Sequence, residues 1–164
     1  SIEDYTPHDG GKIYDMSLAT DRVAAAAAAA RASEVPFILT ARAENFIRGN
    51  RDLDDTIKRL QAFEAAGADV LYAPGLPGLD AIRTVCQSVG KPVNLVMGLS
   101  GSDLTTGQLA DAGVRRISLG GALARAALGA FMDAAKEIQT GNYKFLDRAA
   151  TFPEIAPFMR ANEN

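Results

Sequence analysis

The fold of this chain is decided by the segment PFILTARAE, residues 36–44. Residues 37–40 are a short apolar run that follows a proline, a pattern typical of a strand buried on both faces in a parallel sheet covered by helices. Arg42 and Glu44 follow and are separated by one small residue, so their side chains point to the same side. Ligands bind at the carboxyl ends of such strands, so this charge pair indicates a site, although a salt bridge at the rim explains it equally well.

A unit of strand, loop, helix and glycine recurs along the whole chain. Three helices are predicted to end at Gly67, Gly90 and Gly113, each within two residues of a strand, which indicates right-handed connections between parallel strands. The segment YTPHDGG, residues 5–11, is predicted to be a loop. The predicted strands are residues 1–4, 37–40, 68–73, 92–97 and 114–119, and the predicted helices are residues 17–32, 52–66, 79–89, 103–112, 122–139 and about 153–160.

Two architectures accommodate five parallel strands. An open doubly wound sheet should carry a glycine-rich loop after its first strand, but the first strand here is only a stub. The alternative is the last five units of a (β/α)₈ barrel, which typically takes about 250 residues, so that roughly 90 residues would precede this chain. The length of 164 residues predicts a single domain, residues 1–164.

Composition narrows the class of protein. The chain is 48% apolar with a net charge of −3 and no basic block, which argues against nucleic acid or an anionic membrane as its partner. Cys86 is the single cysteine, so an internal disulfide is excluded, and this suits a reducing, cytoplasmic location. No run of about 18 apolar residues indicates a membrane span.

Five segments, in this order and spacing, resemble the isocitrate lyase/phosphoenolpyruvate mutase superfamily. They are IED at residues 2–4, FILTAR at 37–42, AAGAD at 65–69 leading to APG at 73–75, PVN at 92–94, and GVRRISLG at 113–120. The resemblance implies an α/β fold: strands 4 to 8 of a (β/α)₈ TIM barrel, followed by a C-terminal helical tail. It also implies a homo-oligomer that swaps its C-terminal helix. The implied activity is that of a Mg²⁺-dependent lyase or mutase, which cleaves or rearranges C–C or P–C bonds of small 2-oxo or 2-hydroxy acids through an enolate.

The resemblance assigns roles to three residues. Glu3 matches a fourth-strand glutamate that supports the metal and its water, although a solvated carboxylate at the chain end is the alternative. Arg42 matches the arginine that grips the substrate carboxylate, a task that suits the forked guanidinium, although it could simply pair with Glu44 or Glu3. Asn94 matches a position near the substrate, and its alternative is a hydrogen bond to a backbone group at the strand end.

The chain also departs from the lyases of the superfamily. Those carry a catalytic cysteine in the loop after the Glu3 strand, which is absent from residues 5–11, and Cys86 is predicted to be a small core residue in a helix. Gly75 stands where several lyases have an acid. Isocitrate or methylisocitrate lyase activity is therefore not expected, and the proton would come from His8 or Tyr5, unless His8 is a plain solvated loop residue.

Two other readings stay open at this point. The chain could belong to a non-catalytic member that acts as an assembly module, as the missing cysteine and Gly75 suggest. It could also be a phosphate-binding barrel, with Gly120 and Gly121 as the cradle, although close packing of helix on strand explains these glycines more simply. Because the family places further metal ligands on its second and third strands, we expect the isolated 164 residues to be inactive.

Overall fold

A five-stranded parallel sheet organises the first part of the chain. The structure is a computed structural model that describes residues 1–8, 10–98 and 103–159. Its strands are β1 (Ile2–Glu3), β4 (Thr40–Arg42), β5 (Val70–Tyr72), β6 (Val93–Val96) and β7 (Val114–Ser118), side by side in the order β1-β4-β5-β6-β7. Every neighbouring pair is parallel, as the right-handed strand–helix–strand units predicted.

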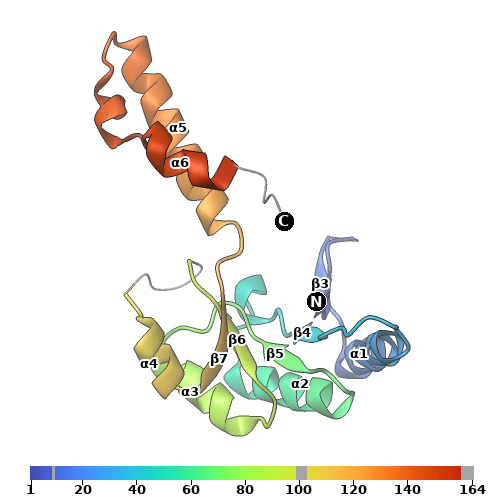
Figure 1. The fold of residues 1–164 in the computed structure, drawn as a ribbon. Helices are drawn as coiled ribbons and strands as arrows, with labels where there is room; N and C mark the ends of the chain where they lie inside the picture. Colours follow the sequence, from blue (N-terminus) through green and yellow to red (C-terminus); the bar gives the residue numbers. More distant parts are fainter. Residues whose placement is uncertain (9, 99–102, 160–164) are drawn as a thin grey trace. The chain divides into compact units, whose positions relative to one another are not determined.

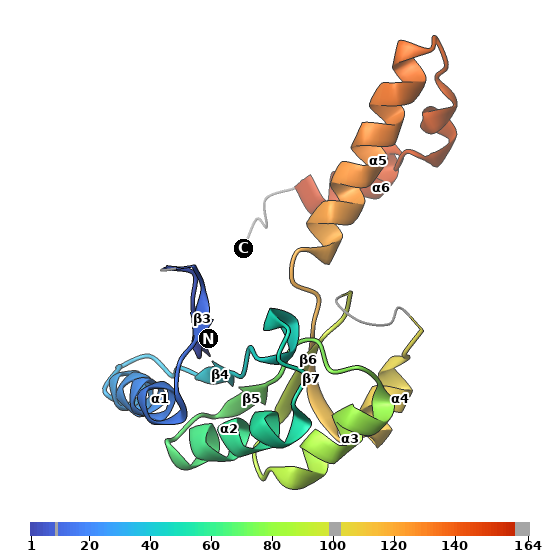
Figure 2. The same ribbon diagram turned by 180° about the vertical axis from the view of Figure 1, so that it is seen from behind.

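Four helices lie together along one side of this sheet (Figures 1 and 2): α1 (Met16–Arg31), α2 (Leu53–Ala65), α3 (Leu79–Ser88) and α4 (Thr106–Asp111). Between sheet and helices lies the core, to which β4, β5, β6 and β7 contribute the buried residues Ala41, Leu71, Val93 and Val114. Helix α1 begins at Met16, one residue before the predicted start, because the carboxylate of Asp15 accepts a hydrogen bond from the Leu18 amide. The α/β layers expected from the sequence are confirmed.

The prediction for residues 37–40 was wrong in its bounds and in its burial. Strand β4 begins at Thr40, and the side chains of Phe37 and Ile38 are exposed, with residue exposures of 60% and 70%. The pairing explains the difference, since Thr40 is the first residue opposite β5 and Ala41 the first opposite β1. Residues 37 and 38 lie ahead of the paired part of the strand, and their apolar side chains have no strand beside them.

Residues 5–11, predicted to be a loop, begin with a short strand that forms a β-hairpin with the residues after them. The short strands β2 (Tyr5–Thr6) and β3 (Lys12–Ile13) pair antiparallel, with Tyr5 opposite Ile13. Gly10 and Gly11, with φ of 81° and 75°, lie where the chain reverses. The hairpin follows β1 directly, so it extends from the carboxyl end of the sheet (Figure 2).

The chain divides into two compact units, Ser1–Gly120 and Gly121–Asn164, and a single domain spanning both stays a prediction. The second unit contains α5 (Ala122–Gln139), the 3₁₀ helix η2 (Lys144–Arg148) and α6 (Phe152–Met159), and an Arg148–Glu137 ion pair joins η2 to α5. The bounds of α5 are those predicted, whereas residue 160 of the last predicted helix lies outside the described residues. No helix within the described ranges is both long and apolar enough to span a membrane.

The end of α4 gives a stability prediction. Gly113 has φ of 102°, and a Cβ atom there would lie 2.8 Å from the Cβ of Cys86. Gly113→Ala should therefore lower the free energy of unfolding by at least about 1–2 kcal/mol, measured by urea unfolding. The matched control is Gly107→Ala inside α4, where a Cβ would lie 3.9 Å from its nearest neighbouring atom. This substitution should raise the free energy of unfolding by about 0.5–1 kcal/mol. Equal effects at both glycines would contradict this account.

Candidate active site

A row of polar and aromatic side chains crosses the face of the sheet that the helices leave uncovered. Glu3, Arg42, Tyr72, Asn94 and Arg116 stand opposite one another in the five successive strands. Residues in register across a parallel sheet point to the same face, and these alternate with the buried residues that face the helices. Glu3, Arg42 and Tyr72 are the last residues of β1, β4 and β5, at the end of the strands where barrels bind their ligands.

Arg42 is held by two carboxylates and one ring. Its Nε donates to Oε1 of Glu44 at 2.8 Å, and its Nη2 lies 2.7 Å from the same oxygen. Its Nη1 lies 2.9 Å from Oε1 of Glu3, and the guanidinium carbon is 4.9 Å from the centre of the Tyr72 ring. The structure therefore brings Glu3 and Arg42 together on one rim. It also contains the Arg42–Glu44 and Arg42–Glu3 salt bridges that the alternative interpretation offered.

Glu44 is fully buried between two arginines. Besides Arg42, its carboxylate lies 3.3 Å from Nη2 of Arg48, whose guanidinium stacks at 3.7 Å on the ring of Tyr5 in the hairpin. Burial raises the pKa of Glu44 above its ordinary value, and the two arginines oppose this shift. The same carboxylate thus fixes the orientation of Arg42 and, through Arg48, the base of the hairpin.

A second buried carboxylate, Asp4, joins four segments at the end of β1. Its Oδ1 accepts a hydrogen bond from the Glu44 amide at 2.8 Å, and its Oδ2 lies 3.1 Å from Nη1 of Arg59 in α2. Arg59 also donates to the carbonyl of Tyr14 at 2.9 Å and pairs with Asp55. Burial raises the pKa of Asp4, against the lowering effects of the Glu44 amide and Arg59. Sequence reasoning missed this cluster, because Asp4 and Arg59 are far apart along the chain.

Asn94 is 1% exposed and makes its hydrogen bonds with other side chains. Its Oδ1 accepts from Nη1 of Arg116 at 2.8 Å, and its Nδ2 donates to Oγ of Ser118 at 3.1 Å. The alternative interpretation expected a backbone partner, but both partners are side chains of β7. Asn94 therefore lies in the row and orients Arg116, and its place near a substrate stays a prediction.

The other predicted residues lie apart from the row. His8 is exposed in the hairpin, where its amide donates to Oγ1 of Thr6 and its carbonyl accepts from Gly11. Cys86 is half-buried in α3, and burial raises the pKa of its thiol, as expected of a structural cysteine rather than a reactive one. Gly75 packs against Ile47, with φ of 88° and a side-chain carbon 2.6 Å from where a Cβ would stand.

Sequence reasoning missed Tyr72 and Arg116, which complete the row. Burial raises the pKa of the Tyr72 hydroxyl, while the charges of Arg42 and Arg116 on either side lower it by less. For Tyr72 an available signal was its place near the carboxyl end of the predicted strand 68–73. A shift of register in β7 removes that signal for Arg116, since Val93 pairs with Val114 but Asn94 pairs with Arg116, which leaves Arg115 as an extra residue.

The described residues fit a Mg²⁺ ion only in part. Within those ranges no group of three or more His, Cys, Asp or Glu side chains is arranged to hold a metal. Glu3 offers one accessible carboxylate on the rim, and oxygen ligands of this kind suit Mg²⁺. Asp4 and Glu44 are committed to arginines and are buried, so neither adds a second ligand.

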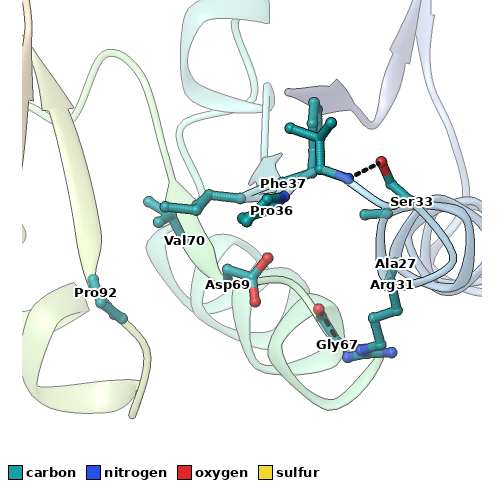
Figure 3. Close-up of a pocket in the computed structure, with 12 residues that line it drawn as sticks. Ala27, Arg31, Ser33, Pro36, Phe37, Gly67, Asp69, Val70 and Pro92 are labelled. Atoms are coloured by element: carbon teal, nitrogen blue, oxygen red, sulfur yellow. Dashed lines mark hydrogen bonds between the residues drawn. The ribbon is translucent and has the colours of Figure 1, made fainter.

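A hollow of about 510 Å³ lies at the opposite, amino-terminal end of the strands (Figure 3). It is lined by Pro36 and Phe37 before β4, by Asp69 and Val70 at β5, and by Arg31 of α1, among others. Both charged groups already bind backbone: Arg31 donates to the Gly67 carbonyl, and Asp69 accepts from the Leu39 amide. The polar row and this hollow are separate features, and the row has the convergent charges of a site.

The sequence model of the family described as phosphoenolpyruvate phosphomutase matches residues 1–139. The chain belongs to this family. Membership confirms the resemblance carried by the five sequence segments. It also confirms the barrel, because the solved relatives superpose on this chain over part of their own length.

Three solved structures show how the family resembles this chain. A Burkholderia cenocepacia J2315 protein, provisionally described as a lyase/mutase, is 51% identical over 98% of this chain and 58% of its own, with a TM-score of 0.92. A provisionally described phosphonomutase from the same organism is 33% identical over 86% of this chain and 56% of its own, with a TM-score of 0.72. A phosphonopyruvate hydrolase, solved in complex with oxalate and Mg²⁺, is 28% identical over 95% of this chain and 56% of its own, with a TM-score of 0.76.

The chain spans less than 60% of the length of these three relatives. Among functionally curated proteins, none matches it. Family membership is therefore established, while the activity, the reaction and the substrate of this protein are matters for proposal.

The Asp4–Arg59 pair gives a second prediction. Arg59→Met should lower the free energy of unfolding by about 3–5 kcal/mol, because the Asp4 carboxylate would remain buried without its cation. Urea unfolding measures this change, and the double variant with Asp4→Asn should recover a large part of it. The control is Arg83→Met, whose partner Asp80 is fully exposed and which should leave the free energy unchanged. A double variant no more stable than Arg59→Met would disprove the explanation.

Glu44 gives a prediction on pH. Because burial raises its pKa above 4.5, the folded chain holds a proton that the unfolded chain releases as pH rises past that value. The free energy of unfolding therefore falls with rising pH through this window. Glu44→Gln cannot titrate, so its free energy of unfolding should fall less steeply between about pH 4 and 7, measured by urea unfolding at each pH. Parallel pH profiles of the two proteins would rule out the shift.

Proposed function

We propose that the complete protein is a Mg²⁺-dependent lyase or mutase that cleaves or rearranges a C–C or P–C bond of a small 2-oxo or 2-hydroxy acid through an enolate. The observation that carries this proposal is the pair of Arg42 and Glu3, 2.9 Å apart at the carboxyl ends of neighbouring strands, in a chain of this family. An enolate develops negative charge as it forms, and positive groups fixed beforehand are the means to stabilise it.

Arg42 binds the substrate carboxylate in this proposal. Glu44 occupies its Nε and Nη2, which leaves the Nη1 end of the guanidinium directed toward Glu3 and the open face. A guanidinium already oriented by a buried carboxylate loses little freedom when it binds, so its hydrogen bonds to a ligand are retained more fully. Glu44 is thus a positioning residue that acts through Arg42.

Glu3 contributes to the metal site in this proposal. Its carboxylate is the one that the described rim offers, so the remaining ligands have to come from other strands of the complete barrel. When bound, Mg²⁺ supplies positive charge to the oxygen that becomes negative. The complex of oxalate and Mg²⁺ with phosphonopyruvate hydrolase supports a similar pairing of metal and small acid here.

The proton donor is assigned to the hairpin. His8 is exposed there, and its imidazole is a side chain that can act as a general acid. The base of the same hairpin is tied to the site, because Tyr5 stacks on Arg48 and Arg48 pairs with Glu44. Asn94 is buried and has an indirect role, because its Oδ1 accepts a hydrogen bond from Arg116 and so orients that side chain.

We also propose that the C-terminal unit packs on a second copy of the protein, in the cytoplasm. Helix α5 contains no buried residue and exposes Leu123, Leu128, Phe131 and Met132, each more than half exposed. Exposed apolar side chains in such number are typical of a surface that another chain covers. This supports the helix exchange between subunits that the resemblance implied.

Binding of oxalate tests the assignment of Arg42. In the complete protein with Mg²⁺, Arg42→Gln should weaken oxalate binding by about 10- to 100-fold, because one charged hydrogen-bonding fork is lost. Isothermal titration calorimetry measures the dissociation constant, and Arg83→Gln on α3 should bind as the wild type does. Unchanged binding by Arg42→Gln, or no binding of oxalate by the wild type, would refute the proposal.

A further inference from the structure

Arg116 differs from Arg42 in having no carboxylate to neutralise it. Among the described residues, its one hydrogen-bond partner is the neutral Asn94, at 2.8 Å, and it takes part in no salt bridge. A guanidinium has five N–H donors, so most of its binding capacity remains unused. Its side chain is exposed on the uncovered face of the sheet.

The position of Arg116 is nevertheless built. Asn94, which holds it, is 1% exposed and is itself fixed by Ser118, whose hydroxyl lies 3.4 Å from the Leu95 carbonyl. Both the oxygen and the nitrogen of the buried Asn94 amide form hydrogen bonds with side chains of β7, so this amide holds those side chains in place. The guanidinium of Arg116 is therefore anchored at one nitrogen and open at the others.

Arg42 and Arg116 lie on the two sides of Tyr72 in the row. Tyr72 is opposite Arg42 on one side and Asn94 on the other, and the charges of both arginines act on its hydroxyl. Arg42 in β4 and Arg116 in β7 are separated by three strand spacings, about 14 Å. Both side chains lie on the uncovered face of the sheet. Two guanidinium groups on the same face, on either side of Tyr72, suit a ligand with an acidic group at each end.

We propose that Arg116 is a specificity-determining residue, which binds a second acidic group of the substrate while Arg42 binds the first. The inference rests on the proposed function, since it takes the row to be the substrate site. Asn94 has a positioning role in it, because it holds the guanidinium toward the ligand. Selectivity follows from charge: a ligand with one acidic group leaves Arg116 unpaired, whereas a ligand with two pairs with both arginines.

The neighbouring residue offers a matched control. Arg115 is the extra residue of the bulge and is also exposed, but its charge acts on Cys86 of α3, whereas that of Arg116 acts on Tyr72. Arg115→Gln and Arg116→Gln remove the same charge from adjacent positions. A general effect of net charge would appear in both variants, and a site effect only in the second.

The experiment compares two unreactive ligands on the complete protein with Mg²⁺. Oxamate carries one carboxylate, and N-oxalylglycine is oxamate with an added carboxymethyl group. Calorimetry should show that the wild type binds N-oxalylglycine more tightly than oxamate. Arg116→Gln should weaken N-oxalylglycine by about 10- to 100-fold and oxamate by less than about twofold. Arg115→Gln should change neither, and Arg116→Lys should keep part of the preference because it keeps the charge.

The outcomes separate this inference from the proposed function. If the wild type binds neither ligand, the proposed function fails and the inference with it. If the wild type binds oxamate but gains nothing from the added carboxylate, or if Arg116→Gln weakens both ligands alike, the inference alone fails. Loss of the preference in Arg115→Gln would also overturn it, because the effect would then be one of overall charge.

Discussion

The rim of the sheet depends on two carboxylates that water does not reach. Asp4 and Glu44 are buried at the ends of β1 and β4, and a buried charge is tolerable only when cations and hydrogen-bond donors surround it. Arg59 forms an ion pair with Asp4, and Arg42 and Arg48 form ion pairs with Glu44. The hydrogen bond from the Glu44 amide to Asp4 ties the two clusters together. The orientation of Arg42 is therefore a result of how the rim is packed.

Most of the fold could be predicted from local patterns. Helical periodicity, capping residues and terminal glycines determine α2, α3 and α5 closely, because these signals act within a few residues. Helix α4 begins at Thr106 instead of the predicted residue 103, because Thr105 forms a capping box with Gln108. The misplaced start of β4 has a different cause, since burial of Phe37 depends on neighbouring strands whose lengths its own segment does not encode. The hairpin was missed because two-residue strands are too short to show alternation.

The residues of the candidate site differ in how far the sequence could predict them. Arg42 was singled out because it follows a predicted strand, whereas Glu3 and Asn94 were named from the family resemblance. Arg116 was missed, because strict alternation along β7 puts Arg115 opposite Asn94 and turns Arg116 toward the helices, whereas the bulge reverses this. Arg59 reaches Asp4 across 55 residues, and no local pattern contains such a contact.

The bulge also affects how β7 can change over evolution. Strands are normally the segments least able to lose a residue, since every later side chain would switch faces. Here one residue already lies outside the pairing, so a chain lacking Arg115 would keep Val114 opposite Val93 and Arg116 opposite Asn94. The strand thus contains a position at which a codon can be gained or lost while both faces keep their side chains, and the local twist is what such a deletion would alter.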